Sequence, residues 1–160
     1  MNNWKWIEIE KKFLVKREKL PKNLRFYKHE VIEQWYLLIT QNKEERIRCK
    51  WNKYFHTIKT WLWLVRWEIE SQISKNEFDF LWQKVRYWKL KKTRYYIPYK
   101  EHIIELDIYK WNLDWLIVAE IEFNNIKECN NFSYPKRFLK DVTDDVEFKN
   151  KNFAVMISSC

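Results

Sequence analysis

The chain has 160 residues, with 31 lysines and arginines against 22 aspartates and glutamates, and a formal net charge of +9. This length supports one sizeable hydrophobic core and is short for two, so we expect a single domain over residues 1–160. The sequence contains no apolar run of 18 residues and its N-terminus lacks the apolar centre of a signal peptide, which argues against a membrane protein and predicts a cytoplasmic one.

The first predicted strand covers about residues 6–15 and includes the run EIEKKFLV. Glu8, Glu10 and Lys12 are two residues apart, so in a strand their side chains share one face of the sheet. Phe13 and Val15 belong to the opposite, apolar face. A single row of this kind is usually the solvated side of an antiparallel sheet, and only its repetition indicates a site.

The same spacing of charges returns in four later segments. In chain order they are Arg46 with Arg48, Arg66 with Glu68 and Glu70, Lys92 with Arg94, and Glu120 with Glu122. These segments mostly keep carboxylates with carboxylates and cations with cations, whereas a solvated face normally mixes both signs. If the strands close into a barrel, alternate residues line its interior. Such an interior would bind divalent metal ions and phosphate oxygens, as a metal-polyphosphate substrate requires.

The remaining elements also follow from local patterns. Seven further strands are predicted at about residues 30–40, 44–50, 53–60, 64–73, 87–97, 101–109 and 115–124, in mostly hairpin order. A helix is predicted after Ser74, because Ser74 and Glu77 have the spacing of a capping box and apolar residues follow at helical spacing. A short helix is expected within residues 17–27, and another from Pro135, a residue favoured at the first helical position.

These residues resemble the CYTH superfamily, also called triphosphate tunnel metalloenzymes, and in particular its short bacterial members. The resemblance depends on the ExExK signature of the first strand and on motifs that follow in the family's order: IEQWYL, RIR, TIK, RWEIE, KKTRYYIPY, LIVAEIEF and DVTDDVEFKN. Each motif alone is weak, whereas their order and spacing are specific. The resemblance implies an α+β fold, an eight-stranded antiparallel β-barrel with peripheral helices, and a docked helix at residues 148–156.

The resemblance also implies roles for individual residues. Catalytic roles fall to Glu8, Glu10, Lys12, Glu68 and Glu70. The grip on phosphate oxygens falls to Lys12, Arg46, Arg48, Lys59, Arg66, Lys92 and Arg94. The metal ligands would be Glu8, Glu10, Glu68, Glu70, Asp107, Glu120 and Glu122, with Asp107 the weakest assignment. Gln72 stands where close relatives often carry a third glutamate, and no residue is singled out as the general base.

The implied activity is metal-dependent hydrolysis of a triphosphate, with Mg²⁺ or Mn²⁺ as cofactor. Inorganic tripolyphosphate is the expected substrate, because the short chain shows no extra segment for a base or a thiamine ring. Thiamine triphosphatase and class IV adenylyl cyclase are alternatives within the family, and a non-catalytic polyphosphate or nucleic-acid binding module is an alternative outside it. The cations lie within the strand pattern rather than in one run, which favours a small polyanion over nucleic acid, and a homodimer is left open.

The composition departs from the family in one systematic way, since the chain contains no glycine and 11 tryptophans. Ordinary usage predicts roughly 11 glycines in a chain of this length. Tryptophans stand where the family pattern and turn chemistry require glycine, at Trp51 before Asn52, at Trp61 and Trp63, at Trp111 before Asn112, and at Trp115 after Asp114. We hypothesise that a reassigned stop codon is read as glycine in the host and is translated here as tryptophan. The alternative is a genuinely tryptophan-rich protein.

Overall fold

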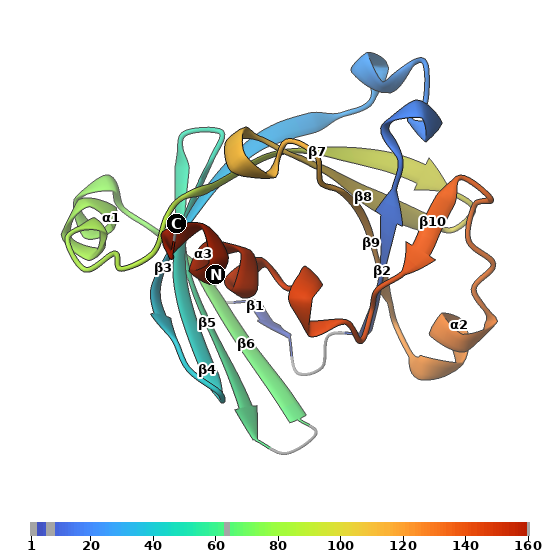
Figure 1. Cartoon of the computed structure of the whole chain (residues 1–160). Coiled ribbons are helices and arrows are strands. Elements are labelled where there is room, and N and C mark those ends of the chain that lie inside the picture. The colour runs from blue at the N-terminus through green and yellow to red at the C-terminus, as the bar shows by residue number, and fades with distance from the viewer. Residues whose placement is uncertain (1–2, 6–8, 63–64, 160) are drawn as a thin grey trace. The chain divides into compact units, whose positions relative to one another are not determined.

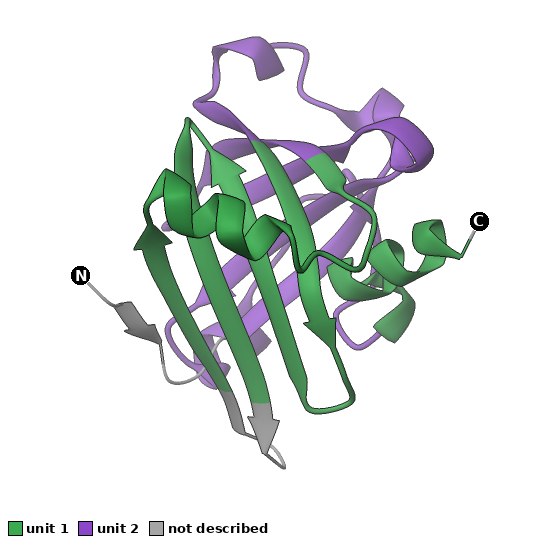
Figure 2. Ribbon diagram, turned by 90° about the vertical axis from the view of Figure 1, so that its left-hand side faces the viewer, with its two compact units in different colours: residues 1–7, 32–91, 146–160 green, residues 8–31, 92–145 purple. Residues whose placement is uncertain are grey.

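A computed structural model describes residues 3–5, 9–62 and 65–159. The chain forms two compact units, one of residues 1–7, 32–91 and 146–160 and the other of residues 8–31 and 92–145 (Figure 2). Both units consist of antiparallel strands with short helices, which confirms the predicted α+β class. The single domain over residues 1–160 stays a prediction. None of the described helices is long and apolar enough to cross a membrane.

The first unit contains a sheet with the strand order β1-β6-β5-β4-β3 (Figure 1). Its strands are β1 (Asn3–Lys5), β4 (Lys43–Lys50), β5 (Lys53–Leu62), β6 (Val65–Ile73) and the part of β3 (His29–Ile39) that begins at Ile32. Its helices are α1 (Lys75–Trp82), α3 (Asn150–Ser158) and a 3-10 turn at Val146–Phe148. The helix expected at residues 148–156 is therefore confirmed, with a start two residues later, whereas β1 was not predicted.

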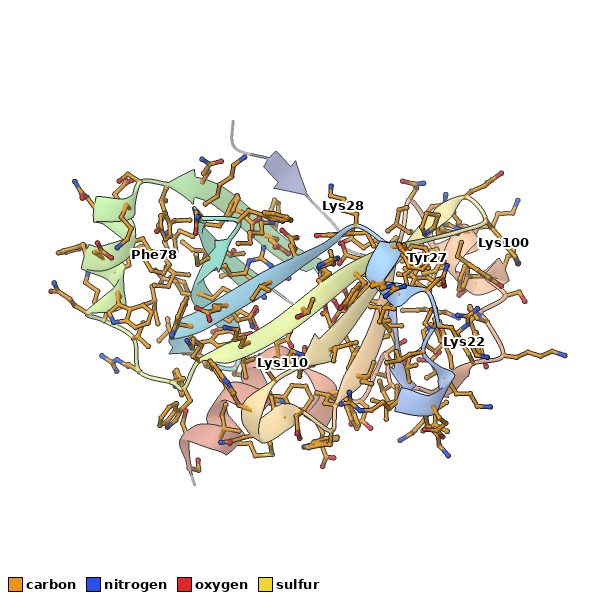
Figure 3. The ribbon with its side chains drawn as sticks, turned by 90° about the horizontal axis from the view of Figure 1, so that it is seen from above. Lys22, Tyr27, Lys28, Phe78, Lys100 and Lys110 are labelled. Atoms are coloured by element: carbon orange, nitrogen blue, oxygen red, sulfur yellow. The ribbon has the colours of Figure 1, made fainter. Side chains whose placement is uncertain are left out.

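Helix α1 lies across one face of this sheet (Figure 2). Its start is the predicted capping box, because the Ser74 hydroxyl accepts from the Glu77 backbone N–H and the Glu77 carboxylate accepts from the Ser74 backbone N–H. Phe78, labelled in Figure 3, packs on the strands, with ring centroids 5.7 Å from Trp35 and 4.6 Å from Tyr54. The buried core beneath α1 consists of Trp35, Leu37, Ile47 and Phe78.

The second unit contains the strand order β7-β8-β9-β2-β10 (Figure 1). Its strands are β2 (Ile9–Val15), β8 (His102–Tyr109), β9 (Ile117–Phe123), β10 (Phe138–Asp141) and the part of β7 (Leu90–Tyr99) that begins at Lys92. Its helices are α2 (Ile126–Asn131) and 3-10 turns at Arg17–Lys19, Leu24–Phe26 and Trp111–Leu113. The helical segment expected within residues 17–27 therefore exists as two 3-10 turns, while α2 was not predicted.

The strands of the second unit separate apolar from charged side chains by alternation. Phe13, Leu106, Ala119 and Ile121 are at most 2% exposed and belong to one hydrophobic core. Residues one position away along the same strands point to the other face, because successive side chains in a strand alternate. The apolar face predicted for the first strand is therefore confirmed at Phe13 and Val15.

The helix predicted from Pro135 is wrong, and the described strands do not form a closed barrel. After Pro135 the chain forms β10, which pairs antiparallel with β2 and sets Phe138 opposite Val15. Phe138 is 8% exposed, with its ring centroid 4.8 Å from that of Phe13, and this burial outweighs the local preference of Pro135 for a helix start. Among the described residues, β1 pairs with β6 alone and β10 with β2 alone, so no closed ring of strands is described.

The turn between β4 and β5 has the backbone that the sequence predicted for it. Lys50 lies opposite Lys53, which leaves a two-residue loop, and Trp51 and Asn52 have φ angles of 53° and 58°. Two successive positive φ angles are typical of a type I′ hairpin turn. Trp111 also has a positive φ, 59°, whereas Trp115 does not, so the glycine-type turn expected at Asp114 and Trp115 is wrong. The turn expected around residues 61–63 reaches Trp63, which lies outside the described residues.

Candidate active site

The first unit carries charged and polar side chains on the sheet face that does not pack on α1. This first charged face consists of Gln34 and Tyr36 on β3, Glu44, Arg46 and Arg48 on β4, Thr57 and Lys59 on β5, and Glu68 and Glu70 on β6. The register makes neighbours of these residues, with Arg46 opposite both Tyr36 and Thr57. Strand alternation and pairing therefore gather side chains from four strands.

Glu68 connects two cations of the first charged face. The Lys59 ammonium lies 2.6 Å from the Glu68 carboxylate, and the Arg46 guanidinium lies 3.8 Å from it. Burial opposes ionisation of Glu68, but Lys59 and Arg46 outweigh it and hold the pKa of Glu68 below its ordinary value. Burial and the Arg46 charge lower the pKa of Lys59. Glu68 is therefore anionic near neutral pH.

Glu70, two residues after Glu68 on β6, has a similar environment. Arg48 donates to the Glu70 carboxylate, and the fully buried Thr57 hydroxyl donates to it at 2.8 Å. Burial opposes ionisation of Glu70, yet Arg48 and Thr57 together lower its pKa. Glu70 is therefore a second carboxylate of this face that is ionised near neutral pH, and it lies beside Arg48.

The second unit has a comparable face. This second charged face consists of Glu10 and Lys12 on β2, Lys92 and Arg94 on β7, Glu105 and Asp107 on β8, and Glu120 and Glu122 on β9. The register places Lys12 opposite Glu120, and Arg94 opposite Asp107. Here too, alternate residues of adjacent strands bring acids and cations together.

Arg94 is the centre of the second charged face. Its guanidinium donates to both oxygens of Asp107, at 2.7 and 2.6 Å, and to Glu120 at 2.7 Å. It also donates to Glu105, and Lys92 donates to Asp107. Asp107 is 0% exposed, so the buried Lys92 and the largely buried Arg94 share one fully buried counter-charge.

Burial and neighbouring charges shift the pKa values of this face in opposite directions. Burial opposes ionisation of Glu120, but Lys12, 2.8 Å away, and Lys92 outweigh it and hold the pKa of Glu120 well below its usual range. Burial and the Arg94 charge lower the pKa of Lys92 to about 8. Lys12 keeps a raised pKa despite its burial, because Glu120 and Glu10 lie close to it.

The second charged face also holds carboxylates in direct opposition. Glu10 on β2 lies opposite Glu122 on β9, and Glu105 lies opposite Glu120, although Arg94 donates to both carboxylates of this second pair. Like charges directly opposite each other destabilise a sheet, and a divalent cation would remove that repulsion. Carboxylate oxygens are the ligands that Mg²⁺ and Mn²⁺ prefer. The donor chemistry therefore fits such an ion, although no three His, Cys, Asp or Glu residues within the described ranges form a metal-binding cluster.

The structure places most of the sequence-predicted site residues on these two faces. Arg46, Arg48, Lys59, Glu68 and Glu70 lie on the first charged face, and Glu10, Lys12, Lys92, Arg94, Asp107, Glu120 and Glu122 on the second. Glu8 lies outside the described residues, and the side chain of Arg66 is not described. The metal-binding and catalytic roles of all these residues stay predictions.

Sequence reasoning missed five members of the two faces. Glu44 and Glu105 are two residues from Arg46 and Asp107, so the alternation rule could have identified them. Gln34, Tyr36 and Thr57 are neutral, and a search for charges two apart passes over them. Each of these three is at most 1% exposed, which indicates that they belong to the interior of the first charged face.

Comparison with known proteins identifies relatives over nearly the whole chain. No family model matches it. An inorganic triphosphatase from Nitrosomonas europaea is 35% identical over 153 residues, covering 94% of this chain and 98% of that protein. An inorganic triphosphatase from Acetivibrio thermocellus is 29% identical over 150 residues, covering 91% of each.

Comparison with solved structures also identifies an inorganic triphosphatase. A crystal structure of an inorganic triphosphatase matches with a TM-score of 0.69 and 32% identity, and the match covers 93% of this chain and 95% of that one. Sequence and fold thus agree over more than nine tenths of both proteins. The chain therefore belongs to the family of these inorganic triphosphatases, within the CYTH superfamily of triphosphate tunnel metalloenzymes.

Proposed function

We propose that the protein hydrolyses inorganic tripolyphosphate to pyrophosphate and phosphate in a metal-dependent reaction. The observation that carries the proposal is that each unit presents a sheet face on which cations and carboxylates stand in register, as Lys59 with Glu68 and Lys12 with Glu120. A protein that only binds polyanions gains nothing from acids beside its ligand, because they repel it. Both curated relatives described above are inorganic triphosphatases, which supports the same substrate class.

The cations of the two faces serve to bind and polarise the substrate. Hydrolysis of a phosphoanhydride bond requires a water placed in line with phosphorus and neutralisation of charge on the transferring and leaving groups. Lysine and arginine side chains held in place before the substrate arrives supply that neutralisation. The proposed phosphate-binding set is Lys12, Arg46, Arg48, Lys59, Arg66, Lys92 and Arg94.

The carboxylates hold the metal and orient the attacking water. The proposed ligand set is Glu8, Glu10, Glu68, Glu70, Asp107, Glu120 and Glu122, and the opposition of Glu10 and Glu122 supports it. A bound divalent cation neutralises phosphate oxygens and lowers the pKa of a coordinated water. Mg²⁺ or Mn²⁺ is proposed, because both accept an all-oxygen ligand set.

Phosphate release from tripolyphosphate tests this function. We expect turnover with Mg²⁺ or Mn²⁺, none in EDTA, and recovery when metal is added back in excess. ATP and thiamine triphosphate serve as comparison substrates, and a preference for either would change the proposed substrate. If the folded protein released no phosphate from any of the three, the hydrolase proposal would be wrong, and tripolyphosphate binding that survives EDTA would favour the binding module.

The proposal extends to location and partners. We propose a cytoplasmic protein whose partner is a small triphosphate rather than a nucleic acid or a membrane, and a homodimer is left open. Cys49 and Cys129 are free thiols, as a reducing compartment favours. The buried cations are paired with carboxylates on both faces, which weakens their attraction for the evenly spaced phosphates of a duplex.

A further inference from the structure

Arg46 is held less tightly by carboxylates than the neighbouring arginine of the first charged face. Its guanidinium lies 3.9 Å from Glu44 and 3.8 Å from Glu68, too far for a hydrogen bond. Arg48, in contrast, donates directly to Glu70. The Arg46 side chain is 8% exposed, and within the described ranges its Nε makes no hydrogen bond, which is also true of the Nε of Arg48. A buried guanidinium with an unused donor attracts an anion.

Tyr36 gives Arg46 a neutral partner. It lies directly opposite Arg46 in the β3–β4 pair, where the nearby Arg46 charge opposes the rise of its pKa, and its hydroxyl oxygen accepts a hydrogen bond of 3.1 Å from the Gln34 amide nitrogen. Tyr36 and Gln34 are 0% and 1% exposed. Burial and the Glu44 charge raise the pKa of Tyr36, so the hydroxyl stays neutral. A neutral acceptor orients a guanidinium without cancelling its charge.

We propose that Gln34 and Tyr36 are positioning residues that orient the Arg46 guanidinium and leave its charge available to a phosphate oxygen of the triphosphate. This inference rests on the proposed function. A carboxylate in place of the Tyr36 hydroxyl would compete with the substrate, whereas an apolar group would let the guanidinium turn toward Glu44 or Glu68. Gln34 acts on Arg46 indirectly, because its amide nitrogen donates to the Tyr36 hydroxyl and so fixes the position of that hydroxyl.

Steady-state kinetics of Tyr36→Phe test the proposal. The substitution keeps the ring and removes the hydroxyl, so we expect KM for tripolyphosphate to rise about tenfold, comparable to the loss of one hydrogen bond to a charged group. We expect kcat to stay within about twofold. Tyr54→Phe, on the opposite face of the same sheet, is the matched control and should change neither constant. An unchanged KM in folded Tyr36→Phe, with or without a lower kcat, would overturn the proposal.

A double-mutant cycle separates action through Arg46 from direct contact with the substrate. If Tyr36 acts through Arg46, adding Tyr36→Phe to Arg46→Lys raises KM by less than about twofold. A further tenfold rise would show that Tyr36 acts independently of Arg46. Should Tyr36→Phe fail to fold, Gln34→Met carries the same test, with an expected rise in KM of about threefold.

A binding measurement keeps this inference distinct from the proposed function. Tripolyphosphate is titrated calorimetrically into wild-type protein and into Tyr36→Phe in the presence of EDTA. Absence of turnover in the wild type in the separate assay with Mg²⁺ or Mn²⁺ counts against the proposed hydrolase activity and does not affect the binding result. A tenfold weaker affinity in Tyr36→Phe supports the positioning role, and an unchanged affinity contradicts it.

The backbone at Trp51 and Trp111 carries a separate inference. Their φ angles of 53° and 59° lie in the left-handed region, where Cβ crowds the following carbonyl and glycine alone has no penalty. Trp51 and Trp111 are 68% and 53% exposed, so burial of their rings offsets only part of that cost. Asn52 follows Trp51 in a type I′ turn, a turn rich in Asn and Gly. We infer that the protein made in its host carries glycine at positions 51 and 111.

Mass spectrometry of the protein purified from its host decides the matter. Peptides with glycine at both positions are expected, and tryptophan at either would overturn the inference. Trp51→Gly and Trp111→Gly should each raise Tm by about 3 °C, through relief of the left-handed backbone. Trp67→Gly, within β6, is the control and should lower Tm, because glycine weakens a strand interior. An unchanged or lower Tm for Trp51→Gly would contradict the conformational reason.

Discussion

Replacing Glu68 and Glu70 together by glutamine is expected to lower tripolyphosphate turnover at least about 100-fold while the protein stays folded. Glutamine keeps the shape of glutamate and one acceptor oxygen but removes the negative charges that would bind a divalent cation. Both carboxylates are ionised near neutral pH, since Lys59 and Arg48 lower their pKa values against the effect of burial. Phosphate release at saturating Mg²⁺ measures the loss, and circular dichroism checks the fold.

Glu45→Gln is the matched control for this double substitution. Glu45 belongs to the same sheet, but its side chain points to the opposite face, because it lies between Glu44 and Arg46 along β4. Its carboxylate lies 2.8 Å from Nε2 of His56. Its neutralisation should leave turnover within about twofold, as expected for a charge that does not touch the substrate. Full activity in the Glu68 and Glu70 variant would exclude these residues as metal ligands.

Asp107→Ala is expected to reduce the free energy of unfolding by about 3–5 kcal/mol, the cost of leaving a buried charge without a partner. Asp107 is 0% exposed and accepts hydrogen bonds from both Lys92 and Arg94. Its removal takes away the carboxylate that the buried Lys92 pairs with, whereas Arg94 keeps Glu105 and Glu120. Urea unfolding followed by tryptophan fluorescence measures the change.

Asp145→Ala provides the comparison for Asp107. Its carboxylate lies 3.6 Å from an exposed lysine, Lys140, and its side chain is 30% exposed. Exposed ion pairs of this kind contribute at most about 1 kcal/mol. If Asp107→Ala cost no more than this control, Asp107 would not be the structural counter-ion that the geometry indicates.

Several features of the fold were predictable because they depend on neighbours in the chain. The capping box at Ser74 and Glu77 predicted α1, since both partners lie within one helical turn. The two-residue turn at Trp51 and Asn52 was predicted from the strands on either side, even though tryptophan is the wrong residue for it. Local patterns of this kind need no knowledge of the tertiary structure.

Other features depend on residues that are distant in the sequence. The segment after Pro135 has a local preference for a helix start, yet it pairs with β2 more than 120 residues earlier, because Phe138 is buried beside Phe13. The α2 helix and the short strand β1 were likewise not predicted. Local propensity is a weak prior, and tertiary packing routinely outweighs it.

The sequence by itself determined which residues share a face, because side chains in a strand alternate with a period of two. That rule placed Glu10 with Lys12 and Glu68 with Glu70 before any partner strand was known. Only the tertiary structure decided which strands lie side by side, and therefore that Arg94 meets Glu105, Asp107 and Glu120. Strand pairing depends on turns and on core burial between distant segments, and neutral residues such as Tyr36 become recognisable as part of the site only once that pairing is known.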